Sequence, residues 1–264
     1  MIAIIGGSGL TQLSTLSMTR REVLRTPYGE PSGALTFGQL AGHAMVFLAR
    51  HGYGHTIPPH EINYRANLWA LREAGIRRVI AVASVGGIRD YFGPGTLVVP
   101  DQIIDYTYGR RHTYFEGPDA PVTHIDFTWP YSKSLRAQLL GAAKQAGETV
   151  HDGGVYGVTQ GPRLESAAEI ARLERDGCDL VGMTGMPEAA LARELGLDYA
   201  CLAVVVNHSA GKGDSAQEIS VEHLGEVMRQ TMGRVQRILV RAVGDQATYQ
   251  QHQGVGSAAD EGAA

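Results

Sequence analysis

LVGMTGMPE, residues 180–188, brings together the two kinds of element from which the fold is built. The apolar run Leu180–Met183 is typical of a buried strand, and it ends at Thr184. Pro187 suits the first turn of a helix, because its ring fixes a helical φ and its missing N–H would have no helical partner there. A hydroxyl and free backbone N–H groups are therefore expected at one point. This arrangement indicates an oxyanion site and directs the interpretation toward phosphate chemistry.

Apolar runs alternate with helical patterns along the chain. Most of the runs lack polar alternation, as expected of strands covered on both faces: Ile2–Ile5, Ala44–Leu48, Arg78–Ala83, Thr96–Val99, Asp179–Met183 and Tyr199–Val206. Helices are predicted at Ile62–Ala74, Ser166–Asp176, Pro187–Leu195 and Val221–Val243. The alternation predicts an α/β fold with a largely parallel or mixed sheet. We expect a single domain over residues 1–244, followed by a loose polar tail over 245–264.

Composition excludes several classes of partner. The net charge of −4 gives no electrostatic support to a nucleic-acid partner, and no apolar run reaches the roughly 18–20 residues of a membrane span. Residues 1–10 lack the features of a signal peptide. Cys178 and Cys201 lie in or near apolar segments and are interpreted as reduced core thiols. We therefore expect a cytoplasmic protein.

Two glycine-containing segments follow predicted strands. IIGGSGL, residues 4–10, allows a sharp turn with N–H groups close to an anion, and Ser8 adds a hydroxyl. It does not match a dinucleotide fingerprint. ASVGGIRD, residues 83–90, is a similar turn whose backbone is expected beside Ser8. A plain turn is the alternative interpretation of both.

ARHGYGHTIPPH, residues 49–60, follows another strand. Arg50 offers a rigid fork for an oxyanion, and His51 is expected to add a further donor. His51, His55 and His60 also allow a metal interpretation, but the two prolines prevent them from sharing one helical face. Solvated or capping histidines are the third alternative.

Two further segments carry polar groups at element boundaries. In TQGPRLES, residues 159–166, Glu165 precedes a helix, and in VVVNHSAGK, residues 204–212, a buried strand exits at Asn207. A helix-start carboxylate and a turn-starting Asn are the alternatives. Sites in open α/β sheets gather at strand ends, which predicts one shared site for Ser8, Arg50, His51, Ser84, Thr184 and Asn207.

GGSGL, ARHGYGHTIPPHEINYRANLWAL, TQGPRLES and GMTGMPEAALA together resemble the purine nucleoside phosphorylase and methylthioadenosine phosphorylase family, from Ile2 to about Ala242. The resemblance implies a homotrimer of single-domain α/β subunits, each with a central mixed sheet flanked by helices. It implies no metal and no organic cofactor, with inorganic phosphate as co-substrate and a purine nucleoside as substrate.

The resemblance also implies roles for individual residues. The phosphate site would consist of Ser8, Arg50, His51, Ala83, Ser84 and Thr184. Met183 would lie against the ribose, and Leu164 would stack on the base, where the family usually has Phe. His124 would reach into a neighbouring subunit's site. The pocket for the 5′ substituent would be lined by Val221 and Leu224, with His55 nearby.

Three base-side residues depart from the adenine-specific branch of this family. That branch has Ser in place of Glu165 and Asp in place of Asn207 and Ser209. Glu165 can accept from N1–H of hypoxanthine, while Asn207 can donate to O6 and accept from a protonated N7. Adenine has the opposite pattern, with an acceptor at N1 and a donor at its 6-amino group. Such a mismatch can lower kcat/KM by a factor on the order of 10⁴.

The predicted pocket for the 5′ substituent of the sugar is apolar and has no group to bind a 5′-hydroxyl. Leu224 and Val221 stand where phosphorylases of ordinary 6-oxopurine ribonucleosides have a His. The combined hypothesis is phosphorolysis of 5′-methylthioinosine to hypoxanthine and 5-methylthioribose 1-phosphate, in purine salvage. Arg50 and His51 would hold the attacking phosphate, and Asn207 would hold the proton on N7 of the leaving base.

Alternative functions are a general 6-oxopurine nucleoside phosphorylase and a methylthioadenosine phosphorylase. A metal-dependent hydrolase using His51, His55 and His60 belongs to a different class, and so does a nucleoside-binding protein without catalysis.

Overall fold

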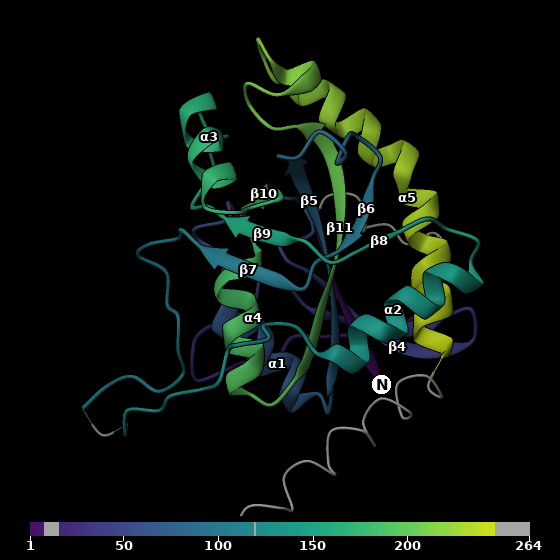
Figure 1. Ribbon diagram of the computed structural model, residues 1–264. Coiled ribbons are helices and arrows are strands. Elements are labelled where there is room, and N and C mark those ends of the chain that lie inside the picture. Colours follow the sequence, from purple (N-terminus) through teal and green to yellow (C-terminus); the bar gives the residue numbers. More distant parts are fainter. Residues whose placement is uncertain (8–15, 119, 246–264) are drawn as a thin grey trace, which may run out of the picture.

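The computed structural model describes residues 1–7, 16–118 and 120–245, which form one mixed sheet of eleven strands with helices on both faces (Figure 1). The hydrogen-bonded path along the sheet is β2–β3–β4–β1–β5–β10–β9–β7, and β11, β6 and β8 join it beside β5. The strands are β1 (Ile2–Gly6), β2 (Leu16–Glu22), β3 (Leu35–Leu40), β4 (His43–Ala49), β5 (Arg78–Gly87), β6 (Leu97–Val99), β7 (Gln102–Asp105), β8 (His151–Asp152), β9 (Val155–Val158), β10 (Leu180–Gly182) and β11 (Asp198–His208).

β5 is the branch point of the sheet. It pairs in parallel with β1 and along its length with β11, while Gly86 and Gly87 at its end pair antiparallel with β10. β1 is also parallel to β4, with Gly6 opposite Ala49. The C-terminal ends of β1, β4, β5 and β11 therefore lie at one edge of the sheet, where open α/β sheets bind their ligands.

Alternate residues of each central strand enter two different cores. Ala3 and Ile5 of β1 pack with α1 (Tyr64–Glu73) and α4 (Gly185–Glu194), whereas Ile2 and Ile4 pack with α2 (Lys133–Gln145) and α5 (Val221–Gly244). Both faces are thus covered, which explains why the strands lack polar alternation. α3 (Ala167–Arg175) packs over β10 in a smaller third core, and a short 3₁₀ turn, η1 (Gly213–Ser215), follows β11.

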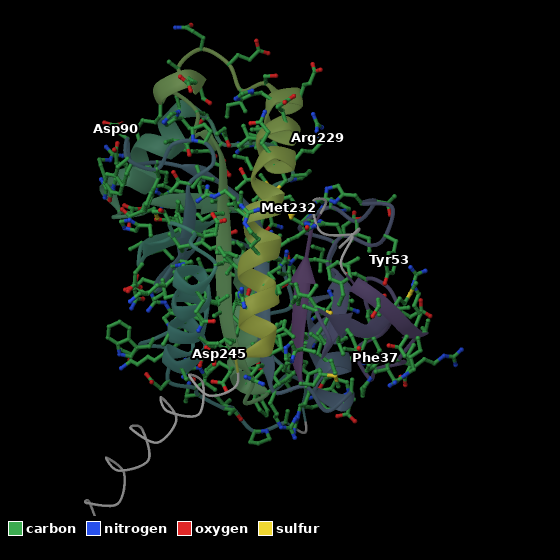
Figure 2. All side chains as sticks on the ribbon, turned by 90° about the vertical axis from the view of Figure 1, so that its right-hand side faces the viewer. Phe37, Tyr53, Asp90, Arg229, Met232 and Asp245 are labelled. Atoms are coloured by element: carbon green, nitrogen blue, oxygen red, sulfur yellow. The ribbon has the colours of Figure 1, made fainter. Side chains whose placement is uncertain are left out.

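α5 is the longest helix and lies along one face of the sheet (Figure 2). Ser220 caps its first turn by accepting from the N–H of His223 at 3.3 Å. Its buried stripe includes Val235, Ile238 and Leu239, the spacing that the sequence predicted. None of the described helices is long and apolar enough to cross a bilayer.

The predicted fold class, α/β with a central mixed sheet, is confirmed. The sequence prediction missed β2, β3, β7, β8 and β9, which are short or carry polar residues, and it missed α2, although Leu135 and Leu139 have helical spacing. β10 ends at Gly182 instead of Met183. α4 is assigned from Gly185, but Met186 has non-helical dihedrals, so its regular turns begin only after that residue.

Candidate active site

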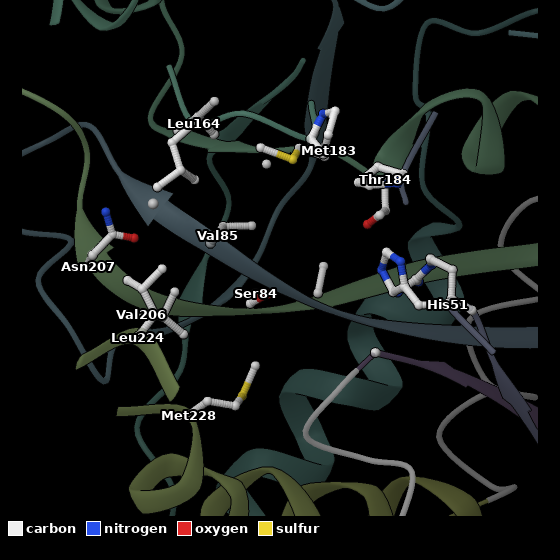
Figure 3. Close-up of a pocket in the computed structure, with 18 of the residues that line it drawn as sticks. His51, Ser84, Val85, Leu164, Met183, Thr184, Val206, Asn207, Leu224 and Met228 are labelled. Carbon is white, nitrogen blue, oxygen red and sulfur yellow. The ribbon is translucent and has the colours of Figure 1, made fainter. Parts of the chain in front are cut away.

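A cavity of about 560 Å³ lies at the edge where the parallel strands end, a volume typical of small-molecule sites (Figure 3). Asn207 and Leu164 lie at one end, His51 and Thr184 at another, and Leu224 and Met228 on a third side. Most of the predicted site residues line it: Arg50, His51, His55, Ala83, Ser84, Leu164, Glu165, Met183, Thr184, Asn207, Ser209 and Leu224.

Arg50 follows β4 and is buried, with 1% of its surface exposed. Its Nε and Nη2 donate to the two carboxylate oxygens of Glu188 at 2.7 and 2.8 Å, and its Nη1 donates to the carbonyl of Val82 at 3.0 Å. These contacts use three of the five N–H donors of a guanidinium group. Because Arg50 also lines the cavity, the remaining donors are available to a bound oxyanion. The Nε and Nη2 side of the guanidinium group, which was predicted to bind an oxyanion, is therefore occupied by Glu188.

Glu188 lies in α4 and is fully buried. The hydroxyl of Tyr199 on β11 donates to Glu188 Oε1 at 2.8 Å, so the carboxylate joins three elements. Burial opposes the charge on Arg50, but the adjacent carboxylate raises the pKa of Arg50 above its ordinary value. Arg50 is therefore cationic, and together with Glu188 it forms a pair without net charge.

His51 lines the cavity as predicted, and a main-chain contact determines which ring nitrogen faces it. Its Nδ1 lies 2.9 Å from the carbonyl of Ile57, so Nδ1 carries the proton and donates. Burial, together with the nearby charge of Arg50, lowers the pKa of His51 to about 4. At neutral pH the ring is neutral and Nε2 is an acceptor.

Thr184 is the N-cap residue of α4, but its side chain does not cap the helix. Figure 3 shows its hydroxyl oxygen on the side of the cavity where His51 lies. Ala83 and Ser84 of β5 line the cavity between this end and the opposite one. The structure thus brings hydroxyl and guanidinium donors together as the sequence predicted.

A β-bulge aims Asn207 into the cavity. The register between β11 and β5 shifts between Val205 and Asn207, so that one extra residue is inserted. Without the bulge, Val206 and Asn207 would point to opposite faces; with it, both line the cavity.

The main chain fixes the orientation of the Asn207 amide. Its Nδ2 donates to the carbonyl of His208 at 2.5 Å, which places Oδ1 toward the cavity (Figure 3). Asn207 therefore presents an acceptor and retains one amide hydrogen for a second contact. This orientation follows from the neighbouring carbonyl, which requires a donor at that position.

Glu165 and Ser209 flank Asn207 in the lining. The hydroxyl of Thr159 donates to Glu165 Oε1 at 2.5 Å, which holds the carboxylate at the cavity wall. Ser209 is 2% exposed, and its Oγ has no hydrogen-bond partner among the described residues. A buried polar atom without a partner in a cavity wall indicates a ligand contact.

The third side of the cavity is apolar. Leu224, Met228 and Met232 stand at i, i+4 and i+8 on one face of α5, with Val206 and Ile219 beside them. Met228, Met232 and Ile219 were not predicted, although continuing the helical spacing from Leu224 would have found the two methionines.

Three predicted residues are not placed in this cavity. Ser8 lies outside the described residues. Val221 begins α5, but its side chain is likewise outside the described part of the chain. His124 is exposed and does not line the cavity of its own chain. The described residues include no group of three or more His, Cys, Asp or Glu that could hold a metal ion.

Comparisons with known proteins identify the family of the chain. The profile described as Phosphorylase superfamily matches residues 1–244. The chain belongs to the phosphorylase superfamily. A relative from Pseudomonas syringae pv. tomato, named probable S-methyl-5'-thioinosine phosphorylase, is 54% identical over 91% of this chain and 97% of its own length. The 6-oxopurine nucleoside phosphorylase of Pyrococcus furiosus is 43% identical over 92% of this chain and 91% of its own.

Solved structures of the superfamily share the fold over nearly the whole chain. The methylthioadenosine phosphorylase from Schistosoma mansoni in complex with adenine superimposes with a TM-score of 0.88, at 31% identity, over 97% of both chains. The family resemblance seen in the sequence is therefore confirmed.

Removing the charge of Glu188 should destabilise the protein, because Arg50 would be left as a buried cation without a counter-charge. For Glu188→Gln we expect the free energy of unfolding, measured by urea denaturation at neutral pH, to fall by about 3–5 kcal/mol. The exposed pair Arg229–Glu226 on α5, at 3.3 Å, is the matched control, and Glu226→Gln should cost less than about 1 kcal/mol. Similar losses for both variants would contradict the assigned role of the buried pair.

The environment of His51 predicts its titration. At about pH 5.5 its ring should still be neutral and protonated on Nδ1, as read by ¹⁵N NMR, whereas an unperturbed imidazole with a pKa of about 6.5 would be mostly charged. Since the pKa of the folded form is lowered, the contribution of His51 to stability is present above the unfolded value and is lost as the pH falls toward about 4. A charged ring, or a proton on Nε2, would show that the Ile57 contact does not set its state.

Proposed function

We propose that this enzyme catalyses the phosphorolysis of 5′-methylthioinosine, giving hypoxanthine and 5-methylthioribose 1-phosphate in purine salvage. The observation that carries the proposal is a single cavity with three chemically different sides: donors suited to an oxyanion, polar groups suited to a 6-oxopurine edge, and an apolar wall. The name of the Pseudomonas syringae relative supports the same substrate.

The base-side groups complement hypoxanthine. Glu165 accepts from N1–H, and the Asn207 Oδ1 that faces the cavity accepts from a protonated N7. O6 has two donors within the same wall, the second amide hydrogen of Asn207 and the unpartnered hydroxyl of Ser209. With adenine, the lone pair at N1 would meet the Glu165 carboxylate, which disfavours adenine nucleosides.

The apolar side suits a 5′-methylthio group. Leu224 and Met228 of α5 offer no hydrogen bond to a 5′-hydroxyl, and a group of methylthio size gains roughly 1–3 kcal/mol in such a pocket. This side favours the methylthio nucleoside over inosine. General 6-oxopurine phosphorolysis is the second candidate, because the Pyrococcus furiosus relative bears that name.

In the proposed reaction, a phosphate oxygen attacks C1′ as the bond from C1′ to N9 breaks, and the electron pair of that bond passes to the base. Arg50 and Thr184 position the phosphate beside the ribosyl cation, and His51 accepts from its P–OH. Asn207 stabilises the proton on N7, so the base leaves neutral. The residues act mainly through positioning and charge placement, without a metal or organic cofactor.

We also propose a homotrimer that acts in the cytoplasm. His124 would enter a neighbouring subunit's cavity, and its segment carries the exposed apolar side chains of Val122 and Trp129, which are 82% and 46% exposed. The segment between β7 and α2 extends away from the body of the subunit (Figure 1). Two buried free thiols, Cys178 and Cys201, are consistent with a reducing compartment. Sedimentation equilibrium should give the mass of three chains, and a monomer would remove the proposed role of His124.

Turnover of three nucleosides tests the proposed substrate. With saturating phosphate, kcat/KM for methylthioinosine should exceed that for inosine by about 10–200-fold, and that for methylthioadenosine by on the order of 10⁴. Equal or faster turnover of methylthioadenosine would contradict the base-edge argument. Equal turnover of inosine would make the enzyme a general 6-oxopurine phosphorylase.

The Glu165→Gln variant tests whether Glu165 determines the preference for hypoxanthine over adenine. It should lower kcat/KM for methylthioinosine and reduce its ratio to methylthioadenosine at least about tenfold. Glu174→Gln, in the outer Lys212–Glu174 pair of α3, is the matched control and should leave the ratio unchanged. An unchanged ratio in Glu165→Gln would remove Glu165 from base recognition.

A further inference from the structure

Arg110 is a buried cation that contacts the turn carrying Thr184. It is 8% exposed and does not line the cavity. Its Nη1 donates to the carbonyls of Met183 and Met186 at 2.8 and 2.5 Å, and its Nη2 donates to the carbonyl of Gln160 at 2.8 Å. Its Nε donates to the side chain of Gln160 at 3.1 Å. All of these partners are neutral.

These contacts join the two turns that carry the substrate groups. Met183 and Met186 bracket Thr184 in the turn between β10 and α4. On the other side, Nη2 also reaches the carbonyl of Thr159 at 3.3 Å, and the hydroxyl of Thr159 holds Glu165. Arg110 therefore fixes the distance between the phosphate-side turn and the base-side turn without touching either substrate.

Charge balance gives Arg110 a second property. The Arg50 charge is matched by Glu188, and His51 is neutral at pH 7. The groups described at the phosphate end therefore carry no net charge, although their ligand is an anion. In residues 1–7, 16–118 and 120–245, no carboxylate forms an ion pair with Arg110, so its charge is left to act on its surroundings. A buried cation that donates to the carbonyls on both sides of Thr184 stabilises an anion bound at Thr184, because little solvent screens it.

We propose that Arg110 is the positioning residue that supplies the net positive charge for phosphate binding, acting through the Met183–Met186 turn that it clamps. This inference rests on the proposed phosphate site at Arg50 and Thr184. It differs from direct phosphate contact, because Arg110 lies outside the cavity lining. It also accounts for a buried guanidinium whose acceptors are main-chain carbonyls, a tyrosine hydroxyl and an amide.

Arg110→Met and Arg110→Lys separate charge from shape. In Arg110→Met, we expect KM for phosphate to rise by about tenfold or more, with KM for the nucleoside changed by less than about threefold. Arg110→Lys keeps the charge and can donate to up to three carbonyls, so it should recover most of the phosphate affinity. Arg163→Met is the matched control, because Arg163 is an exposed side chain on the neighbouring turn, and phosphate KM should stay within about twofold.

The alternative results are distinct. An unchanged phosphate KM in Arg110→Met would overturn the proposal. So would equal rises in both KM values with no recovery in Arg110→Lys, or failure of both variants to fold by circular dichroism, since either would assign Arg110 to stability alone. Thr184→Val reports on the underlying site: if it leaves phosphate KM unchanged, the proposed phosphate site is wrong, whatever Arg110 does.

Discussion

The bidentate pair between Arg50 and Glu188 is the constraint on which the site depends. It ties the end of β4 to the first regular turn of α4, and Tyr199 adds β11 through the same carboxylate. Both charges are buried, so the pair is stable only if its geometry is kept. The fold consequently holds one guanidinium at the ends of the strands, with two donors that its contacts to Glu188 and Val82 do not use. The same pairing removes the net charge that an anion would otherwise meet.

The remaining geometry follows from how three strands end. β5 runs beside β11 throughout, which brings Ser84 and Asn207 to one edge of the sheet. The bulge in β11 turns Asn207 into the cavity, and the His208 carbonyl selects which end of the amide faces the ligand. The short strand β10 is followed by an irregular turn, in which the Thr184 side chain does not cap α4. The β11 bulge and the irregular turn before α4 thus place Asn207 and Thr184, which are both assigned to a substrate.

Sequence patterns and the family resemblance predicted the fold class and placed most of the named site residues correctly in the cavity wall, because buried strands and the polar residues at their ends are local signals. They did not predict Glu188 as the partner of Arg50, since the two residues are 138 positions apart and only the tertiary fold joins them. The acid in GMPEAALA, surrounded by small apolar residues, was the available signal. They also did not predict the tautomer of His51, because the Ile57 carbonyl that determines it is placed by the loop conformation. Arg110 carried no motif, and its role depends on two turns meeting in space.

A crystal structure with inorganic phosphate and hypoxanthine tests the central claim most directly, namely that one cavity binds an oxyanion at Arg50 and a lactam edge at Asn207. The account predicts phosphate oxygens on the two uncommitted N–H groups of Arg50, a phosphate hydroxyl on His51 Nε2, and the base with N7 at Asn207 Oδ1 and N1 at Glu165. Phosphate bound elsewhere, or a base that leaves Glu165 and Asn207 without contact, would contradict it.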